Sequence, residues 1–288
     1  MRIVDLYAGS EPVFSFEFFP PKTDAGYWSL YRTISELKRL EPGFVSVTCG
    51  AAGTTRKKTA DLVVRIQNDI GVTAMAHMVC TGTTRDELEA TLRSMRNDGI
   101  ENVLGLRGDP PRDQPDWRPV EGGFSHANEL IAFLRERFDF CIGGACYPEK
   151  HPEAPSPEAD LERLVGKVEA GAEFLITQLF FDAADYSSFV ERARDAGIEV
   201  PIVPGVMPVV GHANLQRMAS LSPGTKIPEA LEASLAEAGG DPERALDAGV
   251  AWATQQSREL LDRGAPGIHF YTLNRSPATR RVHANLFR

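Results

Sequence analysis

A single glutamate interrupts an aromatic segment near the start of the chain, VFSFEFF at residues 13–19. Side chains alternate between the two faces of an extended strand, so Glu17 lies opposite the face that Phe14, Phe16 and Phe18 share. An ionised carboxylate is costly in apolar surroundings, so Glu17 must find a partner or keep its proton. A carboxyl group that holds a proton near neutral pH is suited to general acid catalysis. A rim position in water or a buried ion pair is the purely structural alternative.

Polar side chains also stand at or near the C-terminal ends of other apolar segments. These residues are Thr48, His77, Arg107, Asp109, Tyr147, Gln178 and Tyr271. One buried polar residue usually belongs to a satisfied core, but packing alone does not explain so many at equivalent positions. If the segments are parallel strands of one barrel, their C-terminal ends meet at one face, where enzymes of that fold build their active sites. The pattern therefore predicts a functional pocket.

Two loops beside this predicted pocket contain further candidates. GLRGDPP (105–111) ends a strand with glycines that would let a ligand approach the backbone, although a plain exit from the strand gives the same pattern. YPEKHPEA (147–154) contains His151 among acidic neighbours. It has no second His or Cys at ligand spacing, so we expect no metal site.

One predicted helix, which begins near Pro157, carries charged residues on a single face. Asp160, Arg163 and Lys167 follow the spacing i, i+3 and i+7. Such a face is either solvated and salt-bridged or a surface that holds the polar tail of a cofactor.

Eight short apolar segments alternate with longer amphipathic ones, as expected for buried parallel strands joined by helices. The expected strands are 13–19, 44–49, 73–79, 102–108, 141–148, 174–181, 202–209 and 267–274. The expected helices are 25–40, 56–69, 84–98, 126–137, 157–170, 183–196, 212–220, 241–263 and 277–286. The pattern predicts the α/β class and a closed (β/α)₈ TIM barrel, a single domain over residues 1–288. Two open, doubly wound domains are the alternative, but no linker divides the chain and no GxGxxG string occurs.

Local signals place several helix ends. Helix starts are indicated by three signals, namely Thr84 together with Glu87, Ser125 alone, and Asp182 alone. Glycines that would end helices in the left-handed conformation are Gly99, Gly171, Gly197 and Gly264. The stretch 227–243 (IPEALEASLAEAGGDPE) predicts an extra helix before the last helical region.

Composition excludes several classes of protein. The 288 residues are 42% hydrophobic and 25% charged with a net charge of −9, which is typical of a globular enzyme and gives no basic surface for nucleic acid. No apolar stretch is long enough to span a membrane and the N-terminus lacks a secretory pattern, so we expect a cytoplasmic protein. The four cysteines form no CxxC pair and are expected to be reduced, buried thiols rather than disulfides or a metal site.

Taken together, these motifs resemble those of the methylenetetrahydrofolate reductases, in order and over nearly the whole chain. The motifs are FSFEFFPPK, FVSVTCGA, AHMVC, LRGDPP, YPEKHPEA, KVEAGAEFLITQLFFD, PGVMP and HFYTLNRSPATR. The chain is similar to the short bacterial form, which is one catalytic barrel. The resemblance implies bound FAD, NADH or NADPH as hydride donor, and reduction of 5,10-methylenetetrahydrofolate to 5-methyltetrahydrofolate in a ping-pong cycle of one-carbon and methionine metabolism. It also implies a homo-oligomer.

The resemblance assigns roles to individual residues. Glu17 matches the general acid, and Asp109 matches the aspartate that contacts the pterin near the flavin. Gln178 matches a residue used by both folate and nicotinamide, while Tyr271 and Arg275 match folate-binding positions. The positions that match FAD-binding residues are Thr48, His77, Arg107, Gly108, Asp109, Ala127, Tyr147, His151, Asp160 and Lys167.

Three positions depart from the family pattern. Cys49 stands where relatives often have an aromatic residue, Gly166 where some have a basic one, and His212 where some have an aromatic residue that stacks on a ligand. None of these touches the proposed acid.

Two alternative functions are another flavin-dependent barrel, such as a proline-dehydrogenase-like enzyme, and a flavin- or folate-binding subunit without turnover.

Overall fold

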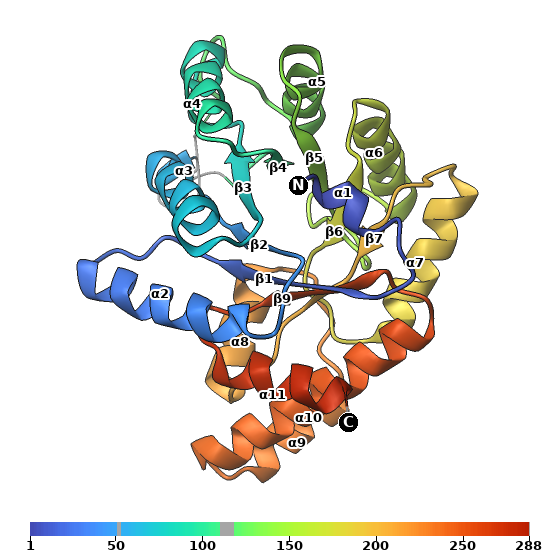
Figure 1. The fold of residues 1–288 in the computed structure, drawn as a ribbon. Coiled ribbons are helices and arrows are strands. Elements are labelled where there is room, and N and C mark those ends of the chain that lie inside the picture. Colours follow the sequence, from blue (N-terminus) through green and yellow to red (C-terminus); the bar gives the residue numbers. More distant parts are fainter. Residues whose placement is uncertain (51–52, 110–117, 288) are drawn as a thin grey trace.

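Nine parallel strands form one sheet in the computed structural model, which describes residues 1–50, 53–109 and 118–287. The strands are β1 (Val13–Phe18), β2 (Phe44–Val47), β3 (Ala74–Val79), β4 (Asn102–Leu106), β5 (Cys141–Cys146), β6 (Phe174–Thr177), β7 (Ile202–Val203), β8 (Gly205–Val206) and β9 (Gly267–Tyr271). Their order is β7-β6-β5-β4-β3-β2-β1-β9-β8. Figure 1 shows the strands at the centre of the molecule, surrounded by helices.

The predicted seventh strand closes the barrel in two pieces. β7 pairs with β6, β8 pairs with β9, and only Pro204 lies between β7 and β8. Proline has no N–H to donate to a sheet, which explains the break at this residue. Its carbonyl still accepts a hydrogen bond from the N–H of His269 at 2.9 Å. One chain segment therefore joins both ends of the sheet, and the predicted (β/α)₈ TIM barrel is confirmed.

The helices follow the predicted alternation. They are α1 (Ile3–Leu6), α2 (Asp24–Lys38), α3 (Arg56–Arg65), α4 (Arg85–Asn97), α5 (Ala127–Arg137), α6 (Pro157–Glu169), α7 (Ala183–Asp195), α8 (His212–Leu221), α9 (Glu229–Glu237), α10 (Pro242–Asp262) and α11 (Pro277–Leu286). A π-helical turn, η2 (Ile66–Ile70), continues α3. The predicted extra helix is α9, whereas α1 was not predicted.

Most of the predicted helix ends are confirmed. Thr84 caps α4 in a capping box with Glu87, and the side chain of Asp182 caps α7. The start signal at Ser125 was wrong by one residue, because His126 is the N-cap of α5. The carboxylate of Glu129 accepts hydrogen bonds from the N–H groups of both Ser125 and His126. The four glycines predicted to end helices all have positive φ values.

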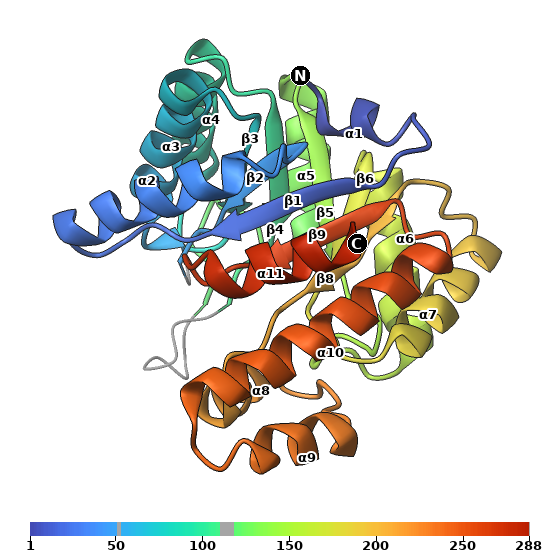
Figure 2. The ribbon, with the colours of Figure 1, turned by 60° about the horizontal axis from the view of Figure 1, so that its bottom comes forward.

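Helix α1 closes the N-terminal end of the barrel, opposite the end where α8 and α9 lie (Figure 2). Ile3 is fully buried in a cluster that fills the barrel interior with Phe44, Leu104 and Phe174. The N–H of Ile3 donates to Asn102 at 2.8 Å. These contacts fill the N-terminal end of the barrel mainly with apolar side chains.

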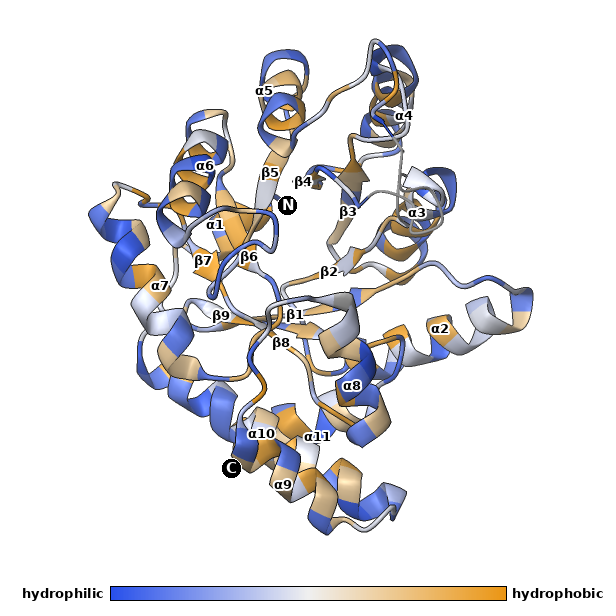
Figure 3. Ribbon diagram, turned by 180° about the vertical axis from the view of Figure 1, so that it is seen from behind, coloured by the Kyte–Doolittle hydropathy of each residue, from blue (hydrophilic) through white to orange (hydrophobic). Residues whose placement is uncertain are grey.

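Two further apolar clusters lie outside the barrel. The larger one packs the inner faces of the surrounding helices onto the strands, and in Figure 3 the hydrophilic residues of these helices lie mainly on their outer sides. The smaller one joins α8, α9 and the start of α10 through Leu215, Leu231 and Ala245. Because α8 and α9 have a core of their own, they extend the molecule beyond the C-terminal ends of the strands.

All four cysteines are free thiols. Cys80, Cys141 and Cys146 are buried and Cys49 is partly buried, and burial raises the pKa of all four thiols. Within the described ranges, no three His, Cys, Asp or Glu side chains are grouped so that they could hold a metal ion. Nor do those ranges contain a helix with the length and apolar character needed to cross a membrane.

Candidate active site

Glu17 lies inside the barrel near the C-terminal end of β1, between two histidines. Its Oε2 is 3.5 Å from Nε2 of His77 on β3 and 3.6 Å from Nε2 of His269 on β9. The Glu17 side chain is 19% exposed, whereas that of His269 is fully buried. The carboxyl group thus has the polar partners that the sequence analysis required and still reaches the surface of the site.

His77 is a neutral ring at physiological pH. Burial, helped by the nearby His269, lowers its pKa to about 4, although the carboxylate of Glu17 acts in the opposite direction. Among the described residues, its Nε2 has no hydrogen-bond partner. Glu17 therefore faces an uncharged imidazole on the β3 side.

The end of β9 holds the backbone around Glu17. The Thr272 hydroxyl donates to the carbonyl of Glu17 at 2.6 Å. Asn274 brackets Phe19: its Nδ2 donates to the Phe19 carbonyl at 2.8 Å and its Oδ1 accepts from the Phe19 N–H at 2.9 Å. Asn274 has φ of 59°, a left-handed conformation that asparagine tolerates better than most residues. Thr272 and Asn274 were not predicted, because sequence alone does not show which strands are neighbours.

A groove of about 820 Å³ lies at the C-terminal ends of β3, β4 and β5 and continues along α6. It brings together eight residues predicted from the sequence to bind FAD, namely Arg107, Gly108, Asp109, Ala127, Tyr147, His151, Asp160 and Lys167. The groove has the size of a small-molecule or cofactor site. The remaining two FAD-binding candidates, Thr48 and His77, are not in its lining as far as the described residues show.

The guanidinium group of Arg107 is held on one side of this groove. It forms a bidentate ion pair with Glu153, with Nη1–Oε2 at 2.5 Å and Nη2–Oε1 at 2.7 Å. These bonds raise the pKa of Arg107, and they lower that of Glu153. Glu153 also lines the groove. Glu153 was not predicted, since a glutamate in a polar loop gives no signal in the sequence.

The loop after β5 is fixed to α6. The Asp160 carboxylate accepts from the N–H of His151 at 2.8 Å, and the His151 ring packs edge-on to Tyr147 with centroids 4.7 Å apart. Burial is the main cause that lowers the pKa of His151 and raises that of Tyr147 to about 12. Both rings are therefore neutral at pH 7, and Asp160 holds the loop in place.

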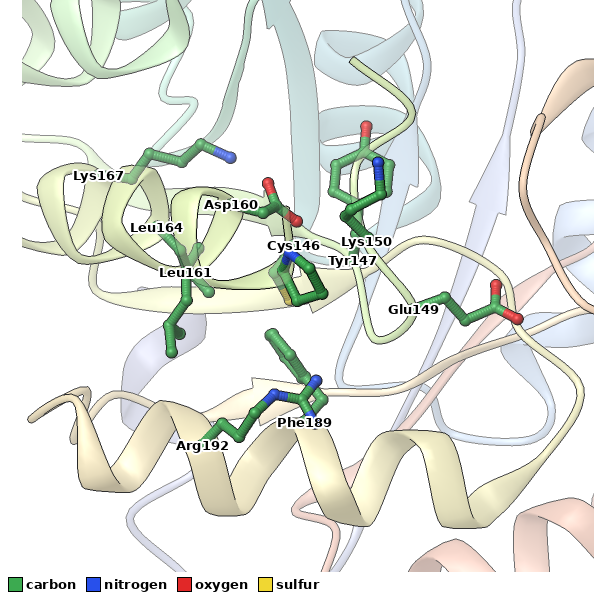
Figure 4. A pocket seen from close by; sticks show the side chains of 11 residues that line it. Cys146, Tyr147, Glu149, Lys150, Asp160, Leu161, Leu164, Lys167, Phe189 and Arg192 are labelled. Carbon is green, nitrogen blue, oxygen red and sulfur yellow. The ribbon is translucent and has the colours of Figure 1, made fainter. Parts of the chain in front are cut away.

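Lys167 brings a positive charge to the same groove. Its ammonium donates to the carbonyl of Ala145 at 2.8 Å, and burial lowers the pKa of Lys167. Figure 4 shows Lys167 and Asp160 extending from α6 toward the loop that carries Tyr147. Lys167 and Asp160 thus bring charges of opposite sign to this part of the groove.

Of the predicted folate-binding residues, Asp109 lines the groove, whereas Gln178, Tyr271 and Arg275 are not among the described residues that line it. Tyr271 is at the end of β9, where its hydroxyl donates to the Thr177 carbonyl at 2.5 Å, and burial raises its pKa well above the usual value. Gln178 follows β6, and its Oε1 accepts from the N–H of Leu179 at 3.0 Å. Arg275 is exposed, directly after Asn274. Glu17 and these three residues thus lie at or just beyond the C-terminal ends of β1, β6 and β9.

Comparisons with known proteins agree with this architecture. The family model described as "Methylenetetrahydrofolate reductase" matches residues 2–286. The chain is 38% identical to 5,10-methylenetetrahydrofolate reductase of Escherichia coli (strain K12), covering 91% of this chain and 86% of that protein. The chain belongs to the methylenetetrahydrofolate reductase family.

Other relatives in the methylenetetrahydrofolate reductase family are longer. "Methylenetetrahydrofolate reductase (NADH) 1" of Arabidopsis thaliana is 37% identical over 99% of this chain and 51% of that protein. The chain thus spans about half the length of the plant and yeast relatives it matches. A solved structure from Clostridium thermocellum, titled as an uncharacterized protein that binds two copies of 5-methyl-5,6,7,8-tetrahydrofolic acid, has the same fold. Its TM-score is 0.68, at 16% identity over 99% of this chain and 98% of that one.

The three departures from the methylenetetrahydrofolate reductase pattern lie in two places. Cys49 and Gly166 both line the groove, whereas His212 is exposed at the start of α8. A Cβ atom built on Gly166 would meet nothing within 4 Å. The groove is therefore wider at Gly166 than it would be with any larger residue there.

Proposed function

We propose that the protein reduces 5,10-methylenetetrahydrofolate to 5-methyltetrahydrofolate with NADH or NADPH, through bound FAD in a ping-pong cycle. The observation that carries the proposal is the place of Glu17 near the C-terminal end of β1, in a barrel of the methylenetetrahydrofolate reductase family whose groove lies at the same ends of β3, β4 and β5. The plant relative's name specifies NADH, which favours NADH as the donor here as well. A cytoplasmic location and a homo-oligomeric state go with this proposal.

The groove fits FAD in size and in chemistry. It offers cationic Lys167 to a pyrophosphate, the flat rings of Tyr147 and His151, and open space at Gly166. Gly108 has no side chain, so its backbone lines the groove just after β4. Arg107, Asp109, Ala127 and Asp160 would complete the binding surface. The chemistry that bound FAD supplies is hydride transfer from the nicotinamide to the one-carbon unit of the folate.

Glu17 would act as the general acid. In its protonated form it donates a proton to the N10 side of the folate, so that the C–N10 bond breaks and a cationic iminium remains at N5. Asp109 is exposed at the end of β4 and carries the negative charge that would stabilise this cation. Gln178 and Tyr271 would orient the pterin, and the exposed guanidinium of Arg275 would bind a carboxylate of the glutamate tail.

Asp109→Asn should slow folate reduction about 10-fold or more, but flavin reduction by nicotinamide much less. The reason is that only the folate half-reaction develops a positive charge beside the carboxylate. Rapid-mixing measurements of each half-reaction check this prediction. Equal losses in both would contradict the role of Asp109 in stabilising the cation.

The experiment that tests the whole proposal follows the flavin absorbance near 450 nm in anaerobic stopped flow. NADH and NADPH are added separately, and methylenetetrahydrofolate is added second. We expect bleaching by the preferred nicotinamide and then recovery on adding the folate. Bleaching without recovery would favour another flavin-dependent barrel with a different acceptor. A protein that binds flavin but never bleaches would favour a binding subunit without turnover.

A further inference from the structure

His269 lies in a layer of polar side chains inside the barrel that no role described above uses. It is fully buried on β9, and each of its ring nitrogens faces a serine. Nδ1 is 2.7 Å from Oγ of Ser15, and Nε2 is 3.3 Å from Oγ of Ser46. The same Nε2 is 3.6 Å from Oε2 of Glu17.

Strand register brings these residues together. Ser15 on β1 pairs with His269 on β9, and Glu17, two residues further along β1, pairs with Ser46 on β2. Side chains two residues apart on a strand share a face, so Ser15 and Glu17 both point into the barrel. The imidazole of His269 thus lies across both, with the plane of its ring nearly parallel to that of Phe44, at 5.8 Å between centroids.

In a neutral His269 the direction of the hydrogen bond at Nδ1 is coupled to the tautomer, because a serine hydroxyl can either donate or accept. If the hydroxyl of Ser15 donates to Nδ1, the ring proton must be on Nε2. The N–H of Nε2 then faces the carboxyl group of Glu17. The opposite tautomer would turn a lone pair toward Glu17, which would repel the carboxylate.

We propose that His269 is a positioning residue for Glu17, and that Ser15 fixes the tautomer in which His269 donates toward the carboxyl group. The proposal rests on the proposed function, in which Glu17 is the general acid. A purely structural role, in which His269 only fills the barrel, is the alternative. Both roles allow a loss of stability on mutation, but only the positioning role confines the kinetic loss to the folate half-reaction.

The titratable groups that face Glu17 come from two strands. They are His77 on β3, and His269 and Tyr271 on β9. Since His77 is neutral over the working range and the pKa of Tyr271 is raised well above the usual value, neither changes charge near pH 7. A change in the pH profile on altering Ser15 therefore reports on the link between His269 and Glu17.

The first test is Ser15→Ala in the FAD-loaded enzyme, with Ser257→Ala as the control. Ser257 is equally buried, on α10, and its hydroxyl has no partner among the described residues. In Ser15→Ala we expect the maximal rate of folate reduction to fall about 10-fold, because orientation of the acid is lost. The midpoint of the pH profile of folate reduction should also move to higher pH, since the N–H of His269 that stabilises ionised Glu17 is lost. Flavin reduction by NADH should stay within about 2-fold, and Ser257→Ala should change neither rate.

A second pair of variants replaces the ring itself. The side-chain nitrogen of glutamine can take the place of Nε2. The asparagine side chain is too short for this, and its nitrogen lies near the position of Nδ1. We expect His269→Gln to keep most of the folate rate and His269→Asn to lose about 10-fold, at similar melting temperatures. If either histidine variant fails to fold, the Ser15→Ala measurement decides.

The possible outcomes separate this proposal from the proposed function. Equal losses in both half-reactions, or an unchanged pH profile in Ser15→Ala, would show that His269 is structural, while the wild-type activity stands. If the wild-type protein does not reduce methylenetetrahydrofolate, the proposed function fails and this proposal fails with it.

Discussion

Replacing Glu17 with glutamine is expected to leave FAD bound and reducible by nicotinamide, but to slow reduction of methylenetetrahydrofolate by about 10²–10⁴-fold. Glutamine has nearly the same size as glutamate and can still contact His77 and His269, so the barrel interior should stay packed. What it lacks is a proton that it can release to the N10 side of the folate. The loss should therefore appear in one half-reaction only.

The measurement is the rate of each half-reaction in anaerobic stopped flow. Glu191→Gln makes the same chemical change on the exposed face of α7, beside the other end of the barrel, and should leave both rates unaltered. Folate reduction within a few-fold of the wild-type rate in Glu17→Gln would show that Glu17 is only part of the buried polar layer. A parallel fall in FAD binding would show instead that Glu17 shapes the groove.

The fold could be predicted because its signals repeat along the chain. Each strand is an apolar segment bounded by turn residues, and each helix has its own capping and periodic pattern. Helix α1 was missed because IVDL is a single turn with no side-chain cap. Its stability comes from Ile3 inside the barrel, a tertiary contact that no local pattern shows. The division of the seventh strand into β7 and β8 depends on Pro204, which the sequence analysis did not treat as a break.

The site was predicted only in part. Residues at the ends of strands could be named, since the barrel brings all those ends to one face. Their partners could not, because contacts such as those between Ser15 and His269 depend on which strands are neighbours and on their register. His269 gives no signal in the sequence, as a buried histidine in an apolar strand is usually a core residue. Similarly, the ion pair between Arg107 and Glu153 joins residues 46 positions apart.

A second large effect is expected at the exit of β4, where Gly108→Ala should lower the free energy of unfolding by about 3 kcal/mol. Gly108 has φ of 87°, which costs an L-residue about 1–2 kcal/mol. In addition, a Cβ atom here would lie 2.1 Å from Cγ1 of Val79 and 2.9 Å from Oγ1 of Thr81. Val79 is buried and branched at Cβ, so its rotamer cannot easily change. Urea unfolding of the apoprotein measures the loss.

Gly122→Ala separates the two causes, because Gly122 has a similar φ of 76° but nothing within 4 Å of its Cβ position. This control should lose only about 1 kcal/mol, the cost of the backbone conformation. The difference between the variants then measures the close approach of β4 to β3 at the edge of the groove. Relief of the overlap must displace either Val79 or the chain from Arg107 to Asp109, all of which line the groove. Gly108→Ala should therefore also weaken FAD binding, whereas Gly122→Ala should not. Equal losses of stability in the two variants would mean that the chain around Gly108 shifts to accommodate the Cβ atom at no cost in free energy. Only the backbone conformation would then require glycine at position 108.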